Sequence, residues 1–183
     1  MMIGEAPGAE EDKAGFSFVG RSGKLLDKIM ASIGLDTNKD ILIANVVKSR
    51  PPENRAPQKN EVEACRPYLL KQIELVQPKL FILLGATAFK HVFLPETNFK
   101  GMAGAVGTVM QRRLLRDIEK KEFPVVQESH PCMILYHPAY LLYDPRKKAD
   151  MWTHMKLLRE YLVAQKLLPK NTNFNPNPEK LPF

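Results

Sequence analysis

The chain alternates between short apolar runs and longer stretches in which apolar residues recur every three or four positions. Short apolar runs are typical of strands buried on both faces, and the three- and four-residue recurrence is typical of amphipathic helices. The clearest strand candidates are residues 41–47 and 80–84, and the clearest helix candidates are residues 23–33 and 59–76. This alternation predicts a layered fold of repeated βα units.

Weaker patterns complete the expected set of elements. Short strands are predicted at residues 1–3, 123–126 and 132–136, and helices at residues 86–93, 111–122 and 147–164. Pro67 lies inside the helix predicted at 59–76 and should kink or divide it. Beyond residue 168 Pro and Asn dominate, so we expect one domain over residues 1–168 and a disordered tail over residues 169–183.

Charge and composition narrow the class of protein. The chain has 27 Lys and Arg against 20 Asp and Glu, a net charge of +7, which favours a polyanionic partner. Its apolar runs are far shorter than the roughly 20 residues that span a bilayer. The first residues resemble no secretory signal, so no membrane association is expected. The only two cysteines, Cys65 and Cys132, form no disulfide framework, and a reducing cytoplasm is the expected compartment.

A glycine-rich loop after the first strand is the first candidate site. It begins with Gly4, Glu5, Ala6, Pro7 and Gly8 and continues through Glu11 and Phe18 to Gly23. Glycines between a strand and a helix allow backbone N–H groups to approach a phosphate or a planar ligand. The loop has neither the GxxxxGK[ST] nor the GxGxxG spacing of nucleotide-binding motifs. The alternative is an acidic surface loop with glycines at its turns.

Asn45 interrupts the apolar strand at 41–47. A buried amide that lacks partners costs about 1–3 kcal/mol, and a ligand at the end of the strand could satisfy it. The alternative is that Asn45 caps the backbone of a neighbouring loop. The loop that follows carries Lys48, Arg50 and Arg55, which could bind a polyanion or could be ordinary solvated charges.

His137 follows the predicted strand at 132–136, and Pro138 stiffens its backbone. A histidine at the ligand-facing edge of a sheet can donate a hydrogen bond to developing negative charge. His130-Pro131 is a second pair of this kind, and one of the two is expected to be a turn feature. We favour His137 because of the residues after it, Tyr140, Leu141 and Leu142. These residues could insert into a stack of bases or could pack in the core.

The spacing of possible metal ligands predicts no metal site. The four histidines and two cysteines form no HExxH, His-x-His or CxxC pattern.

Five segments, in this order and spacing, resemble the family-four, thermostable-type uracil-DNA glycosylases: residues 4–12, 18–23, 45–55, 64–69 and 136–142. The resemblance runs from residue 1 to about residue 160. It implies an α/β fold, a three-layer α/β/α sandwich on a four-stranded parallel sheet. It also implies hydrolysis of the N-glycosidic bond of uracil in DNA, which leaves an abasic site. Three alternatives stay open: a glycosylase for hypoxanthine or xanthine, a DNA-binding protein that no longer cuts, and an enzyme that binds a nucleotide or a sugar phosphate.

The resemblance implies a role for each residue of the candidate site. His137 would donate to the uracil oxygen that gains charge, and Phe18 would stack on the flipped base. Asn45 would read the base edge, because its amide can accept from N3–H and donate to O4. Glu11 would lie near C5 and help to reject the methyl group of thymine. The remaining residues expected to bind substrate are Gly4, Ala6, Pro7 and Gly8.

Activation of the water is expected to differ from the better-known bacterial and viral enzymes. Those enzymes carry an Asp where this chain has Ala6, so general-base catalysis from that position is impossible here. The resemblance implies that the loop backbone and Glu5 hold the water. It also implies DNA contacts by Lys48, Arg50 and Arg55, with uracil-containing DNA as the partner of a monomer.

The family carries a [4Fe-4S] cluster on four cysteines, and this chain departs from that pattern. Ser49 stands at one cysteine position, and only Cys65 occupies another. We therefore expect no normal four-cysteine cluster and no cofactor. Either ordinary packing replaces the cluster, or the chain lacks an N-terminal portion and one further ligand.

Overall fold

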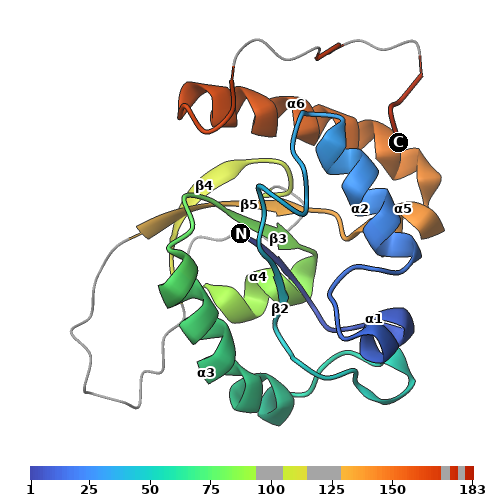
Figure 1. Cartoon of the computed structure of the whole chain (residues 1–183), viewed down its shortest axis with the longest axis vertical. Coiled ribbons are helices and arrows are strands. Elements are labelled where there is room, and N and C mark those ends of the chain that lie inside the picture. Colours follow the sequence, from blue (N-terminus) through green and yellow to red (C-terminus); the bar gives the residue numbers. More distant parts are fainter. Residues whose placement is uncertain (94–104, 115–128, 170–173, 177–179) are drawn as a thin grey trace.

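A central β-sheet lies between two layers of helices (Figure 1). The computed structural model describes residues 1–93, 105–114, 129–169, 174–176 and 180–183. In these residues the sheet has the strand order β2-β1-β3-β5-β4. The strands are β1 (Met2–Gly4), β2 (Ile43–Asn45), β3 (Phe81–Leu84), β4 (Val109–Arg113) and β5 (Ser129–Leu135).

Four of these strands are parallel, because β1 pairs with β2 and β3, and β3 pairs with β5. The predicted α/β class is therefore confirmed. The strand count differs, since β4 adds an antiparallel edge strand beside β5. A helix was predicted from residue 111 to 122, and this is wrong for residues 111–113, which belong to β4. The rest of that helix beyond residue 114, and the strand predicted at 123–126, lie outside the described residues.

The error at β4 has a physical reason. Its polar composition resembles a solvated helix, but Arg112 is only 3% exposed and its guanidinium lies 4.9 Å from the centre of the Phe89 ring. The backbone of β4 pairs with the free edge of β5, a long-range contact that local periodicity does not reveal.

Six α-helices surround the sheet in the described residues. They are α1 (Ala9–Ala14), α2 (Arg21–Ala31), α3 (Lys59–Val76), α4 (Ala86–Val92), α5 (Pro138–Tyr143) and α6 (Lys148–Ala164). Helix α3 has the predicted bounds and runs through Pro67 as one element, so the proline does not divide it. Helices α1 and α5 were not predicted, because each has only six residues.

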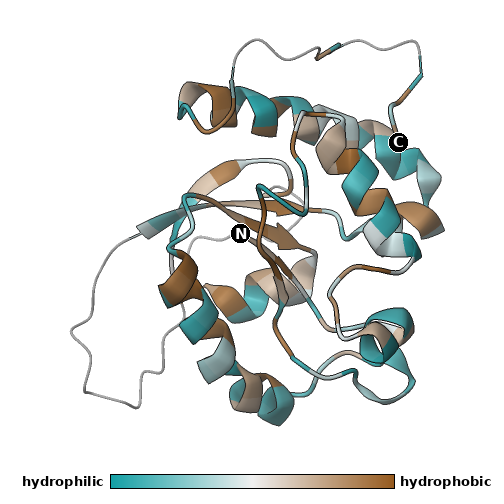
Figure 2. Ribbon diagram, in the orientation of Figure 1, coloured by the Kyte–Doolittle hydropathy of each residue, from teal (hydrophilic) through white to brown (hydrophobic). Residues whose placement is uncertain are grey.

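The two faces of the sheet carry separate apolar clusters. Met2, Ile82 and Met133 belong to the upper apolar cluster, which includes residues of α2, α5 and α6. Their neighbours Ile3 and Phe81 belong to the lower apolar cluster, which includes residues of α3 and α4. Successive side chains of a strand point to opposite faces, so this alternation produces the three layers. Figure 2 shows mostly apolar strands between helices that carry both polar and apolar residues.

The C-terminal segment contacts α6. The Phe174 and Phe183 rings lie 5.7 and 6.2 Å from the Trp152 ring, and the Trp152 indole N–H donates to the Pro176 carbonyl at 3.3 Å. The disordered tail expected for residues 169–183 stays a prediction, because residues 170–173 and 177–179 lie outside the described residues. The Pro- and Asn-rich composition hides two aromatic side chains that bury area against α6. Among the described helices, none is long and apolar enough to cross a membrane.

Candidate active site

The C-terminal ends of the parallel strands meet at one edge of the sheet, where open α/β folds bind ligands. Gly4 ends β1, Asn45 ends β2, Gly85 follows β3, and His137 lies just beyond β5. In Figure 1 the chain leaves β1 toward α1 and leaves β5 toward α5 on the same side of the sheet. Residues from distant parts of the sequence thus lie at a common edge.

Gly4 allows Asn45 and Phe18 to lie close together. A methyl group on Gly4 would lie 2.6 Å from Oδ1 of Asn45 and 2.9 Å from Cζ of Phe18, so a larger residue does not fit. Phe18 has a positive φ of 59°. A methyl group on Gly23 would lie 1.5 Å from the Phe18 carbonyl oxygen. Two glycines of the loop therefore place the Phe18 ring beside the Asn45 amide.

Asn45 presents an unsatisfied acceptor at this edge. Its side chain is 4% exposed, and Oδ1 has no hydrogen-bond partner among the described residues. An unpaired buried acceptor costs about 1–3 kcal/mol, which a ligand donor would recover. The alternative that this oxygen caps a neighbouring loop is not observed.

His137 is oriented as a hydrogen-bond donor. It is the N-cap of α5, where the Ala139 N–H donates to its Nδ1 at 3.2 Å. A neutral ring then carries its proton on Nε2. Burial lowers the pKa of His137 below the usual 6.5, although the nearby carboxylates of Glu5 and Glu11 act in the opposite direction. The ring lies 5.7 Å from the Phe18 ring, so a neutral donor stands beside the aromatic face.

Glu5 is held by a residue that the sequence did not indicate. Thr87, near the start of α4, donates its hydroxyl to Oε2 of Glu5. The signal for this contact was available, since Gly85 and Thr87 follow the predicted strand at 80–84 and reach the same edge as Glu5. Gly85 also lies close to the site, because a methyl group there would lie 3.5 Å from Cβ of His137.

The rest of the loop is organised around Glu11. Its Oε1 accepts from the Gly20 N–H at 2.8 Å, at the N-cap of α2. A methyl group on Gly8, the N-cap of α1, would lie 2.6 Å from Oε2 of Glu11. Glu11 therefore connects the two ends of the loop, and its charge acts on His137. Ala6 packs partly against the lower apolar cluster, and Pro7 leads into α1.

The cations predicted to contact a polyanion all have protein partners. Lys48 Nζ donates to the Asn45 carbonyl at 2.8 Å and to Gln72 Oε1 at 2.7 Å. Arg55 makes a two-pronged pair with Glu61 at 2.8 and 2.7 Å. Arg50 Nε donates to Asn54 Oδ1 at 2.8 Å. Lys48 differs most from the expected solvent-exposed cation, because its ammonium group is half-buried within the fold.

The segment predicted as an exposed apolar loop is the short helix α5. Tyr140 and Leu142 are 40% and 39% exposed. Leu141 is fully buried in the upper apolar cluster, so the prediction that it is free to enter a base stack is wrong. The cause is helical periodicity, which turns one side of α5 toward the core. Tyr143, at the end of α5, is 86% exposed.

The two His-Pro pairs lie at opposite ends of β5. His130 is near its first residue, at the far edge of the sheet from Gly4 and Asn45, and packs edge-on against Phe81 with ring centres 5.6 Å apart. His137 follows its last residue.

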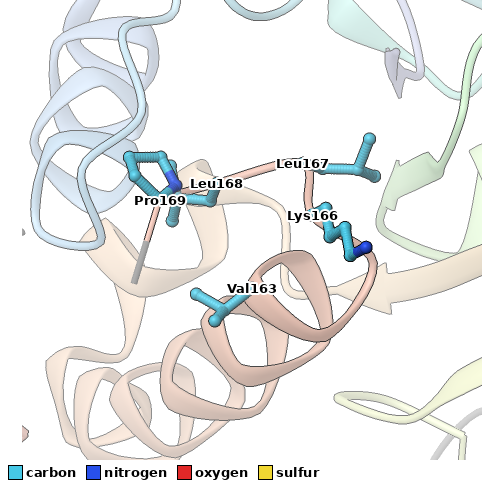
Figure 3. Close-up of a pocket in the computed structure, with 5 residues that line it drawn as sticks. All are labelled: Val163, Lys166, Leu167, Leu168 and Pro169. Atoms are coloured by element: carbon cyan, nitrogen blue, oxygen red, sulfur yellow. The ribbon is translucent and has the colours of Figure 1, made fainter. Parts of the chain in front are cut away.

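A surface hollow of about 500 Å³ lies elsewhere, at the C-terminal end of α6 (Figure 3). Its lining residues are Val163, Lys166, Leu167, Leu168 and Pro169. None of the predicted site residues lines it, so the hollow is separate from the strand-end site.

The residues present do not fit a four-cysteine cluster. The chain has two cysteines. Cys132 is fully buried on β5, whereas Cys65 on α3 accepts from the Lys48 N–H at 3.3 Å. In the part of the chain that the structure describes, no group of three or more His, Cys, Asp or Glu residues could hold a metal ion.

Comparison with known families agrees with this fold. Residues 1–160 match the model of the uracil DNA glycosylase superfamily. The chain belongs to this superfamily.

Three curated relatives carry the name type-4 uracil-DNA glycosylase, which confirms the resemblance inferred from the five segments. The Sulfurisphaera tokodaii protein is 37% identical over 168 residues, which are 91% of this chain and 71% of the relative. The Archaeoglobus fulgidus protein is 40% identical over 141 residues, 75% of this chain and 67% of the relative. The Pyrobaculum aerophilum protein is 38% identical over 154 residues, 82% of this chain and 71% of the relative.

Proposed function

We propose that this chain is a uracil-DNA glycosylase that hydrolyses the N-glycosidic bond of uracil in DNA and leaves an abasic site for repair. The observation that carries the proposal is the buried, unpaired Oδ1 of Asn45 close to the Phe18 ring, which itself lies beside His137. Its relatives named type-4 uracil-DNA glycosylase support the same activity.

Asn45 selects the base by hydrogen-bond complementarity. Uracil presents an N3–H donor, which satisfies the unpaired Oδ1 of Asn45. Cytosine presents an acceptor at N3 and leaves this oxygen unsatisfied. Phe18 stacks on the base once it is flipped out of the helix. Glu11 lies near C5, where its side chain leaves no room for the methyl group of thymine.

His137 stabilises the leaving group. The C1′–N1 bond breaks and its electron pair passes to uracil, which becomes an anion. The Nε2–H of His137 donates to the uracil oxygen that gains charge, and the fixed Nδ1 contact prepares this donor in advance. A water oxygen then bonds to C1′ of the sugar cation and releases a proton. Glu5, oriented by Thr87, holds this water together with the loop backbone.

The enzyme binds uracil-containing DNA as a monomer and works in the cytoplasm, without an iron–sulfur cluster. The net charge of +7 supports association with a polyanion. Exposed Tyr140 and Leu142 contact the DNA near the flipped base. Arg50 and Arg55 reach phosphates by exchanging their present partners. Cys65 and Cys132, the two cysteines of the chain, form no disulfide, which suits a reducing compartment.

The test is excision of uracil from a labelled oligonucleotide, single-stranded and opposite guanine, followed by alkaline cleavage of abasic sites. We expect cleavage by the wild type and a loss of about 10²–10³-fold in the single-turnover rate for His137→Ala, because its donor acts mainly in the transition state. DNA affinity should change little. His130→Ala is the matched control, since it removes a histidine from the other end of the same strand.

Two outcomes would contradict this proposal. Cleavage of hypoxanthine or xanthine oligonucleotides without cleavage of uracil would assign a different base. DNA binding without any abasic product would make the chain a binding protein. Equal losses of rate and affinity in His137→Ala would remove the proposed role of His137.

A further inference from the structure

The end of β2 has an unusual backbone environment. This strand is at the edge of the sheet, with β1 as its neighbour on one side. The Val46 N–H donates to the Gly4 carbonyl at 3.0 Å. Backbone groups of successive residues in a strand point in opposite directions, so the Asn45 carbonyl points away from β1. Lys48 Nζ donates to that carbonyl at 2.8 Å and fills the place of a missing neighbouring strand.

The same side chain reaches helix α3. Lys48 Nζ also donates to Gln72 Oε1 at 2.7 Å, and the Lys48 N–H donates to Cys65 Sγ at 3.3 Å. One residue thereby connects the strand end that carries Asn45 to two turns of α3. Ser49, which follows it, is exposed and takes no part in this connection.

We propose that Lys48 is a positioning residue, which holds Asn45 at the base-binding edge by joining the end of β2 to α3. The statement about base recognition rests on the proposed function. The role replaces the phosphate contact that the sequence predicted for Lys48, because the ammonium group is committed to two acceptors inside the fold. The hydrogen bonds of Lys48 also attach the loop after β2 to α3 in a chain whose cysteines do not fit a cluster.

The half-buried ammonium group of Lys48 lowers the free energy of unfolding at neutral pH. Burial lowers the pKa of Lys48 to about 8, against 10.5 for an exposed lysine. Between these pH values the unfolded chain binds more protons than the folded chain, so the free energy of unfolding rises as the pH increases through this window. At neutral pH this half-buried charge is therefore retained at the expense of stability, as is common where a group serves function.

The first experiment compares Lys48→Met with Lys71→Met. Lys71 is also a lysine of this region, on α3, but its side chain is 60% exposed and its partner is Glu74 at the surface. Both variants lose one positive charge. We expect Lys48→Met to lose at least about tenfold in the single-turnover rate of uracil excision, because small misplacements of a binding group are costly. Lys71→Met should match the wild type, and Lys48→Arg should recover part of the loss.

DNA binding distinguishes positioning from phosphate contact. If Lys48 positions Asn45, the slope of log affinity against log salt is the same for Lys48→Met and the wild type. A slope reduced by about one, with equal weakening on all sequences, would make Lys48 a phosphate contact and overturn the proposal. Excision by Lys48→Met at the rate of Lys71→Met would overturn it as well.

A third measurement does not depend on activity. The free energy of unfolding, measured with denaturant from pH 7 to 10.5, should rise above pH 8 in the wild type by more than in Lys48→Met.

A second variant, Gln72→Leu, keeps the lysine but removes one acceptor, and should lower the excision rate less than Lys48→Met. If the wild type does not excise uracil, the proposed function fails. Identical pH profiles for wild type and Lys48→Met would refute the buried connection itself.

Discussion

One hydrogen bond and burial together determine the protonation of the His137 ring. The Ala139 N–H occupies Nδ1, and burial opposes a positive charge on the ring. Protonation of Nδ1 would place two N–H groups against each other. The proposed donor function is therefore linked to the neutral state of the histidine, and it should persist below the pH at which an exposed histidine becomes charged.

An NMR titration of the imidazole tests this link. The pKa of His137 should lie below 6.5, since burial is the largest influence on it. Glu5→Gln should lower that pKa further, because it removes a negative charge that favours the protonated ring. Glu10→Gln, one residue from Glu11 on α1, serves as the control. A midpoint at or above 6.5, or no response to Glu5→Gln, would contradict this account. As the pH falls below 6.5, the free energy of unfolding should decrease.

Prediction from sequence worked for residues whose placement depends on strand ends. Asn45 lies near the end of one apolar run and His137 follows another, so their position at the C-terminal edge could be inferred. The side chains of Lys48 and Leu141 could not be placed from sequence, because the direction in which each points is set by the fold. That direction was fixed by long-range partners, Gln72 for Lys48 and the upper apolar cluster for Leu141.

The loop between β1 and α2 depends on close contacts with glycine. Gly23 has no room for a side chain, because the Phe18 carbonyl oxygen occupies that space. Gly15, at the end of α1, has a positive φ of 74°, but a methyl group there would have no neighbouring atom within 4 Å. The two positions therefore differ in what a methyl group would disturb.

We expect Gly23→Ala to displace Phe18 and to abolish most uracil excision, with a loss of stability of about 1–3 kcal/mol. Gly15→Ala should lower stability by about 1 kcal/mol through its left-handed backbone and leave excision unchanged. Denaturant unfolding and the oligonucleotide assay measure both effects. Full activity in Gly23→Ala would show that the position of Phe18 is not needed for excision.

The elements that sequence predicted well are the long ones. Helices α2, α3 and α6 repeat their apolar residues over several turns, so their periodicity was readable. Helices α1 and α5 are each too short to show a period, and they occur in segments where glycine or proline indicated a loop. Strand β4 escaped prediction because its polar composition resembles a solvated helix and only its pairing with β5 makes it a strand.

At the scale of the whole molecule, the C-terminal segment and the active site are separate. Trp152 is the only tryptophan of the chain and packs beneath Phe174, whose ring also lies 4.6 Å from the Arg159 guanidinium. These contacts belong to α6, which contributes none of the strand-end residues of the site.

Phe174→Ala should therefore lower stability by about 1–2 kcal/mol and shift the Trp152 fluorescence to longer wavelength, because the indole gains contact with water. Uracil excision should stay at the wild-type rate. Leu181→Ala, at a side chain 39% exposed in the same segment, is the control and should change neither quantity appreciably. An unchanged fluorescence spectrum would mean that Phe174 does not cover Trp152 in solution.

The strand order determines when each strand can pair during synthesis. Strand β5 lies between β3 and β4, although both precede it in the chain. As the chain leaves the ribosome, β3 and β4 each keep an open edge until residues 129–135 emerge. His137 follows them at once, so the last central strand to pair also brings the proposed donor to the leaving base into place. On the proposed mechanism, a nascent chain cannot excise uracil before β5 has paired.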